Sequence, residues 1–273
     1  MAIQKVWAVY FSATGTTQKA VTRIADNIAS ALALERCEHD FTLPAARVKP
    51  LAFNAGDIVI FGTPVYAGRI PNVLLPYLDT LSGGGALAVP VALFGNRAYD
   101  NALIEQRNLL DRKGFIPIAG GAFVGEHSFS TTLGKGRPDA RDMEILDAFS
   151  ADIVNTLRRI NAGESPKHIE VKGDPEAGYY RPKGSNGEFI DIRKVRPIVL
   201  AHCTDCKICA EVCPMGSISH ENVREYTGIC IKCGACSKKC PEHARDYDDA
   251  NYLFHKKDLE EMYARRAEPE TFV

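Results

Sequence analysis

The chain has 273 residues, of which 45% are apolar, and its 33 Lys and Arg nearly balance 34 Asp and Glu, for a formal net charge of -1. This composition is ordinary for a packed protein with one large or two modest domains. The absence of blocks of like charge argues against nucleic-acid and membrane-surface partners. Met1 to Tyr10 lacks a signal-peptide pattern and no apolar run approaches a membrane span, so we expect a cytoplasmic protein.

Residues 1–163 alternate short apolar runs with helical patterns, which is typical of an α/β fold with a doubly wound parallel sheet. The run Val89–Phe94 is apolar throughout, as expected of a central strand covered on both faces. We predict strands at Lys5–Phe11, Cys37–Thr42, Asp57–Gly62, Leu87–Phe94 and Phe115–Val124, and helices at Thr17–Ala33, Asn72–Leu81, Asn101–Lys113 and Asp139–Ile160.

The rest of the chain divides into three parts. Residues 164–197 are rich in Gly and Pro and form a linker, long enough that we expect it to wrap one domain rather than hang free. Tyr179, Tyr180 and Phe189 are candidate anchors for it, and loose aromatics in a tether are the alternative. Residues 198–250 hold the cysteines. Residues 251–273 form a tail with a short helical pattern at Asp258–Arg265, which we expect to pack back on a domain.

Eight of the nine cysteines form two copies of one motif. Each copy has three cysteines separated by two residues, then three residues, a fourth cysteine and a proline: Cys203, Cys206, Cys209, Cys213-Pro214 and Cys230, Cys233, Cys236, Cys240-Pro241. In a reducing cytosol such a cluster indicates metal binding rather than disulfides. Three thiolates at this spacing can wrap three corners of an iron-sulfur cube, while the fourth ligand must come from elsewhere. Two zinc sites are the alternative, which would leave the third cysteine and the Cys-Pro pairs unexplained.

This pattern resembles the bacterial ferredoxins that carry two 4Fe-4S clusters. The resemblance implies a small α+β ferredoxin domain in which each fourth cysteine serves the other cluster. Cluster one would take Cys203, Cys206, Cys209 and Cys240, and cluster two would take Cys230, Cys233, Cys236 and Cys213.

The two motifs differ at the residue after the second cysteine, which is Lys207 in the first and Gly234 in the second. Glycine eases the approach of the backbone to sulfur, whereas Lys207 places a cation near cluster one. We therefore expect the two clusters to differ in reduction potential.

A candidate phosphate site follows the first predicted strand. Hydroxyls, a glycine and the free amides at a helix start favour a phosphate dianion, because the amides point outward and the helix dipole favours negative charge. Simple helix capping by Ser or Thr is the alternative. The residues are Ser12, Thr14, Gly15, Thr16 and Thr17.

Two further loops follow the third and fourth predicted strands. In a sheet of order 2-1-3-4-5 all three loops meet at the switch point. The arrangement resembles the flavodoxin family, which implies that FMN binds here, with its ring between these loops and Tyr66 and Tyr99 stacked on its faces. The ring would contact Thr63, Pro64, Val65, Tyr66, Ala67 and Gly68 in one loop and Asn96, Arg97, Tyr99 and Asp100 in the other.

A long loop after the fifth strand leaves the same edge of the sheet. It contains His127, a candidate proton donor to a substrate or to reduced flavin. The alternatives are that this loop bonds to itself or docks the ferredoxin domain.

The whole chain resembles fusions, found in anaerobic microbes, of a flavodoxin-like domain with a two-cluster ferredoxin. A cluster passes one electron at a time, whereas a flavin accepts one or two. We expect an electron relay to a separate redox partner protein. The alternative is a flavoenzyme, an oxidoreductase that reduces a small-molecule acceptor at the FMN. The sequence leaves open the direction of electron flow and whether two copies form a dimer.

Overall fold

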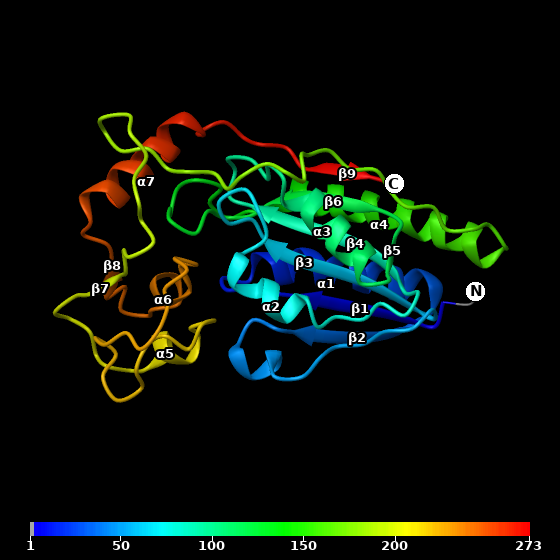
Figure 1. The fold of residues 1–273 in the computed structure, drawn as a ribbon, viewed down its shortest axis with the longest axis horizontal. Coiled ribbons are helices and arrows are strands. Elements are labelled where there is room, and N and C mark those ends of the chain that lie inside the picture. The colour runs from blue at the N-terminus through cyan, green and yellow to red at the C-terminus, as the bar shows by residue number, and fades with distance from the viewer. Residues whose placement is uncertain (1–2) are drawn as a thin grey trace.

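The computed structural model describes residues 3–273, and its larger part is a sheet with helices on both faces (Figure 1). The sheet order is β2-β1-β3-β4-β6-β9, with all strands parallel except β9, so the predicted 2-1-3-4-5 order is confirmed and a sixth position is added. Its strands are β1 (Lys5–Tyr10), β2 (Glu35–Asp40), β3 (Asp57–Pro64), β4 (Leu87–Phe94), β5 (Ile116–Pro117), β6 (Gly120–Val124) and β9 (Glu270–Phe272).

Two apolar layers hold this sheet. On one face α1 (Thr16–Leu32) and α4 (Ala140–Asn161) pack over alternate residues of the strands, such as Val6, Ile58 and Val89. On the other face lie η2 (Asn72–Leu74), α2 (Leu75–Leu78) and α3 (Ala102–Arg112), over Val9, Val59 and Phe61. Because all of β4 is buried, burial of its apolar run drives folding of the central sheet. A short helix η1 (Pro44–Arg47) follows β2.

The fifth predicted strand is broken into β5 and β6. Leu87 pairs with Ile116, but Val91 pairs with Gly121, so the strand gains one residue relative to β4 between these two pairs. This is a β-bulge, and it lies opposite Pro90, which has no N–H to donate to a neighbouring strand. The predicted helix Asn72–Leu81 is likewise shorter, with a single α-turn that begins next to Pro76.

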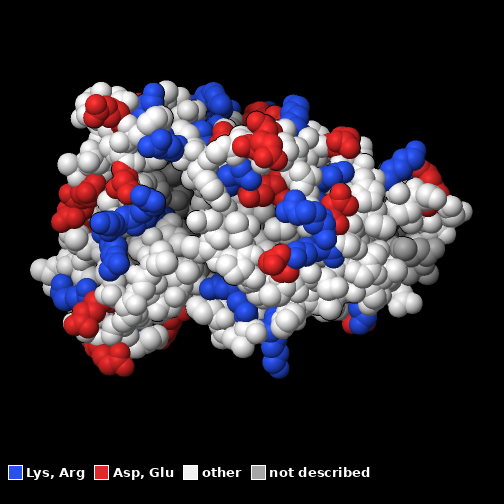
Figure 2. Space-filling view, in the orientation of Figure 1, with Lys and Arg blue, Asp and Glu red and all other residues white. Residues whose placement is uncertain are grey.

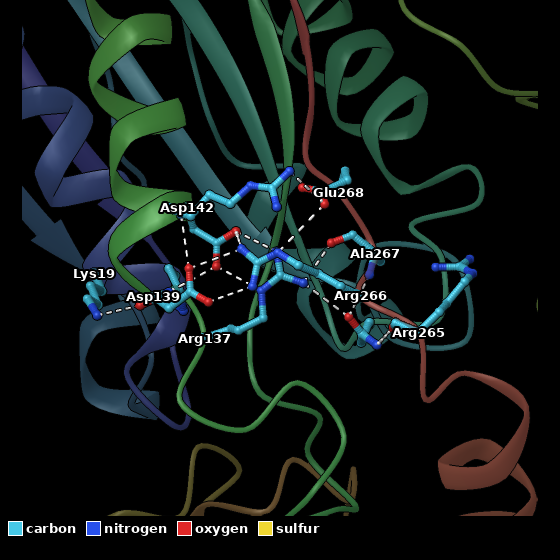
Figure 3. A network of polar contacts seen from close by, with 11 residues as sticks. Lys19, Arg137, Asp139, Asp142, Arg265, Arg266, Ala267 and Glu268 are labelled. Carbon is cyan, nitrogen blue, oxygen red and sulfur yellow. Dashed lines mark hydrogen bonds and ion pairs between the residues drawn. The ribbon is translucent and has the colours of Figure 1, made fainter.

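The tail covers the open edge of the sheet. Its helix α7 (Ala250–Met262) begins eight residues earlier than predicted, because Asp249 accepts a hydrogen bond from the N–H of Tyr252 and so caps it. Beyond α7 the tail adds β9 antiparallel to β6. The buried guanidinium of Arg137 fixes the segment between them (Figure 3): it donates to both oxygens of Asp142 and to the carbonyl of Ala267.

The linker is hydrogen-bonded to the N-terminal domain at several points. The N–H of Ile169 donates to the carbonyl of Pro117, and the N–H of Asp174 donates to Asn101. Farther along, the N–H of Tyr180 donates to the carbonyl of Ala67, and the Arg97 guanidinium lies 4.1 Å from the Tyr180 ring centre. Tyr180 therefore anchors the linker, and the Arg69 guanidinium also lies 5.7 Å from the ring centre of Tyr179.

The cysteine region forms a small lobe with two short helices, α5 (Ile208–Glu211) and α6 (Ala235–Lys238), and a ribbon of β7 (Ile198–Val199) and β8 (Arg245–Asp246). The arrowheads of β3 and β4 point toward this lobe in Figure 1, so the lobe lies beyond the carboxyl edge of the sheet. Basic and acidic side chains are interspersed on the face shown in Figure 2. Within residues 3–273, each helix is too short or too polar to cross a membrane.

Candidate functional site

The eight motif cysteines line two small cavities in the lobe. In each cavity the fourth cysteine of one motif lies with the first three of the other motif. The first cavity has Cys203, Cys206, Cys209 and Cys240, and the second has Cys213, Cys230, Cys233 and Cys236. These are the two sets that the ferredoxin resemblance implies.

Backbone amides donate to the sulfur of each fourth cysteine. The N–H of Ser217 lies 3.3 Å from Sγ of Cys213, and the N–H of Ala244 lies 3.3 Å from Sγ of Cys240. Such bonds favour the thiolate. Burial, in contrast, raises the pKa of Cys233 to about 12, so a bound cation or cluster would be needed to keep this sulfur ionised at neutral pH.

Lys207 and Gly234 have the same backbone conformation, with φ of 68° and 78°. The lysine therefore adopts the turn that the glycine allows. Its Nζ lies 2.7 Å from Oδ2 of Asp205, so a carboxylate offsets the cation that we expected near cluster one. A Cβ at Gly234 would lie 2.6 Å from the carbonyl oxygen of Ser128 in the N-terminal domain. Close contact between the two domains is thus a reason for glycine here.

The two cavities differ in exposure. Cys206 in the first is exposed, whereas Cys233 in the second is buried and packs with Ala235 against the apolar layer of the N-terminal domain. Cys209 of the first set is also buried, so the sets differ in the one exposed cysteine of the first and in the contact of the second with the sheet. Within residues 3–273, no group of three or more His, Cys, Asp and Glu side chains has the spacing of a single metal ion.

The candidate phosphate loop lies at the start of α1. The hydroxyl of Ser12 accepts from the N–H of Gln18, so Ser12 acts at least in part as a helix cap. Thr14, Gly15 and Thr16 remain partly exposed, and a Cβ built at Gly15 meets nothing within 4 Å. Thr17 is buried, with its methyl group beneath Gly62. Space and free amides are thus present above Thr14 to Thr16.

The other two predicted loops contact each other, since a Cβ at Gly68 would meet the side chain of Asp100. Thr63 is buried and accepts from Gln106, while Arg97 pairs with Asp100. Pro64 ends β3, and the N–H of Val65 donates to the carbonyl of Leu93.

The side chains of Asn96 and Tyr99 form hydrogen bonds to the tail. The amide of Asn96 donates to the carbonyls of Tyr263 and Arg265, and the hydroxyl of Tyr99 donates to Glu270. The predicted stacking of Tyr99 on a flavin gains no support from these contacts.

Residues 202–245 match the family model described as a 4Fe-4S dicluster domain. The chain joins a flavodoxin-like domain to a 4Fe-4S dicluster domain. No curated protein matches the chain.

Several solved structures are similar to this chain. A flavodoxin from the domain Archaea is 14% identical, with a TM-score of 0.42, over 57% of this chain and 99% of that one. A Streptococcus pneumoniae flavodoxin is 20% identical, with a TM-score of 0.40, over 56% and 99%. Rubredoxin oxygen:oxidoreductase from Desulfovibrio gigas is 17% identical, with a TM-score of 0.44, over 59% and 38%. The strand order, and not these similarities, defines the fold.

A cavity of about 790 Å³ lies between the flavodoxin-like domain, the linker and the dicluster domain. Tyr66 and Ala67 line it from the first of these, and Tyr180 lines it from the linker. Cys230 and Ile231 line it from the dicluster domain. One cavity therefore reaches both a predicted flavin loop and a predicted cluster ligand. The residues of the phosphate loop, and Asn96 to Asp100, are not among those that line it.

Two histidines lie near this cavity. His127 accepts a hydrogen bond on Nδ1 from the N–H of Phe129, and burial, with Lys238 nearby, lowers its pKa to about 3. It is therefore neutral at pH 7. His255, which the sequence did not single out, is buried and lines the cavity, and its Nδ1 has no hydrogen-bond partner within residues 3–273.

Sequence reasoning also missed Lys238 and Arg245. Lys238 crosses to the loop that contains His127, and Arg245 contacts Cys209. A signal for Arg245 was present: it stands five residues after Cys240, where the first motif has Ile218 five residues after Cys213.

Proposed function

We propose that this protein transfers electrons between two 4Fe-4S clusters in the dicluster domain and an FMN in the flavodoxin-like domain. The observation that carries the proposal is the shared cavity, which Tyr66 and Ala67 line on one side and Cys230 and Ile231 on the other. Bound there, a flavin would accept one or two electrons, and clusters would supply them singly.

The cysteine sets fit the clusters. Each set has four thiols around one cavity, and amide N–H groups donate to a sulfur in both. The apolar neighbours Ile218 and Val223 limit the access of water, which helps to set the potential of such a site.

The residues around the larger cavity also fit a flavin. Tyr66, Phe129 and Tyr180 provide aromatic walls for a flat ring. The Nδ1 of buried His255 has no hydrogen-bond partner within residues 3–273, so it could bond to a nitrogen or oxygen atom at the edge of the flavin ring. The phosphate would lie outside this cavity, on the partly exposed Thr14, Gly15 and Thr16 at the start of α1.

The burial pattern favours a relay over reduction of a substrate. Cluster one would receive or deliver electrons at the surface beside exposed Cys206, and cluster two would exchange them with the flavin. The linker and the dicluster domain both line the flavin cavity, which is the arrangement expected of a relay. His127 is neutral and its Nδ1 accepts a hydrogen bond, so proton donation to a substrate is not its favoured role.

Anaerobic reconstitution of the full chain tests the proposal. Iron, sulfide and flavin should be retained in the ratio of two 4Fe-4S clusters to one FMN, with EPR signals of two interacting clusters on reduction. Zinc in place of iron, or clusters without any bound flavin, would overturn it.

A further inference from the structure

Arg245 is a buried cation with no acidic partner. Its residue exposure is 5%, and within residues 3–273 its guanidinium makes no ion pair with a carboxylate. Burial of a guanidinium without a counter-charge is costly, so buried cations are paired with an anion. The anionic groups nearest to Arg245 must therefore be sought among the cysteines.

The guanidinium is held in one orientation. Nη1 donates to the hydroxyl of Tyr226 at 2.9 Å, and Nη2 donates to the carbonyl of Val223. Tyr226 in turn donates to the carbonyl of Pro197 at 2.7 Å. With these bonds made, Nη2 also donates to Sγ of Cys209 at 3.2 Å. Arg245 is thus aimed at a predicted ligand of cluster one.

Only the second of the two repeated cysteine motifs supplies such an arginine. Ser217 and Ala244 occupy equivalent places in the two motifs, because each donates its N–H to the sulfur of the preceding fourth cysteine. The next residue is Ile218 in the first motif and Arg245 in the second. Ile218 lines the cavity of cluster two, and Arg245 lines the cavity of cluster one. At these equivalent positions cluster one has a cation and cluster two has an apolar group. Cluster two has a different cation, Lys232, whose Nζ lies 3.1 Å from the carbonyl oxygen of Cys230 and, among the described residues, has no direct bond to a sulfur.

We propose that Arg245, through its hydrogen bond to Cys209, raises the reduction potential of cluster one. This inference rests on the proposed function, since it requires both clusters. A cluster becomes more negative when it is reduced, and a cation or an N–H donor at a ligand sulfur stabilises the reduced form. Cluster two has Ile218 in place of that donor. The charge of Lys207, in contrast, is offset by Asp205.

Arg245 is a positioning residue in this proposal, and the potentials of the clusters test it. EPR-monitored redox titration of the full-length, anaerobically reconstituted protein should resolve two steps. In Arg245→Met one step should fall while the other stays in place, whereas Arg245→Lys, which keeps the charge, should recover part of the fall. The matched control Ile218→Met, at the equivalent position of cluster two, should not lower the step that Arg245→Met lowers.

Iron and sulfide analysis of each sample distinguishes a failure of the proposed function from a failure of the role of Arg245. If the wild-type chain holds no clusters, the proposed function fails. If wild-type, Arg245→Lys and Arg245→Met chains hold equal iron and sulfide but share the same two potentials, the role of Arg245 fails. Equal falls of both steps in Arg245→Met would also contradict it, because the cation would then act on both clusters alike.

Discussion

Lys238 in α6 donates to the carbonyl oxygen of Ser130 in the flavodoxin-like domain, with a distance of 2.9 Å between Nζ and that oxygen. The same ammonium donates to the carbonyl of His127 at 2.7 Å and pairs with Glu126. The loop that contains His127 therefore docks the dicluster domain, which was one of the alternatives for it. Cys233 and Cys236 lie on the same short segment as Lys238, so these contacts fix the second cysteine set against the sheet.

Loss of the Lys238 contacts should loosen the domain interface. We expect Lys238→Ala to lower the free energy of unfolding by about 1–3 kcal/mol, because several acceptors lose one charged donor. It should also slow electron exchange between clusters and flavin, as measured by stopped-flow absorbance. The control is Lys239→Ala, which removes an exposed neighbour. Equal effects of the two variants would contradict the docking role of Lys238.

Tyr66 should contribute to flavin binding and Tyr99 should not. Tyr66 lines the 790 Å³ cavity, whereas Tyr99 donates to Glu270 in the tail. Because aromatic stacking contributes about 0.5–1.5 kcal/mol beyond burial, Tyr66→Leu should weaken FMN binding by up to roughly tenfold. Tyr99→Phe should bind FMN as the wild type does. Flavin fluorescence titration of the apoprotein measures both, and a larger loss in Tyr99→Phe would reverse the assignment.

The Arg137–Asp142 pair should be important for stability. Both side chains are buried, with 2.8 Å between Nε of Arg137 and Oδ2 of Asp142. Arg137→Met would remove two charged donors from the buried carboxylate of Asp142, which keeps only the partly exposed Arg266 as an ionic partner, so we expect a loss of about 1–3 kcal/mol. Arg23→Ala breaks an exposed pair with Asp147 and should cost about 0–1 kcal/mol. Urea unfolding followed by the fluorescence of Trp7 compares them, and similar midpoints would refute this role.

His127 should make the protein less stable in mild acid. Its pKa is lowered to about 3 by burial and by nearby cations, below the ordinary 6.5, so the unfolded chain binds the proton more readily. The contribution of His127 to stability is complete above pH 6.5 and is lost as the pH falls toward 3. Between pH 7 and pH 5 the loss should be roughly 2 kcal/mol. In His127→Asn, urea unfolding should show a flatter pH dependence, and an unchanged slope would exclude this origin.

Much of the sheet could be predicted because its strands are apolar runs whose burial decides the fold. The bulge opposite Pro90 could not, because it depends on how two distant strands align. The start of α7 had a local signal, the capping residue Asp249, followed by Tyr252, His255 and Leu259 at helical spacing.

The candidate site likewise has features that the sequence could predict and features that it could not. Motif spacing and the ferredoxin resemblance gave the two cysteine sets that line the cavities. The contacts of Asn96 and Tyr99 with the tail could not be foreseen, because they join residues about 170 positions apart. The same is true of the cavity between domains, since its walls come from three separate segments.

Stepwise reduction most directly tests the central claim, which is that electrons pass between the clusters and the flavin within one chain. Small additions of a low-potential reductant to the anaerobic, fully reconstituted chain are followed by flavin absorbance and by cluster EPR in the same samples. We predict that the flavin and the clusters reach a common equilibrium at every step, because the cavity between Tyr66 and Cys230 brings their sites together. A flavin that stays oxidised while both clusters are fully reduced would contradict electron transfer within the chain.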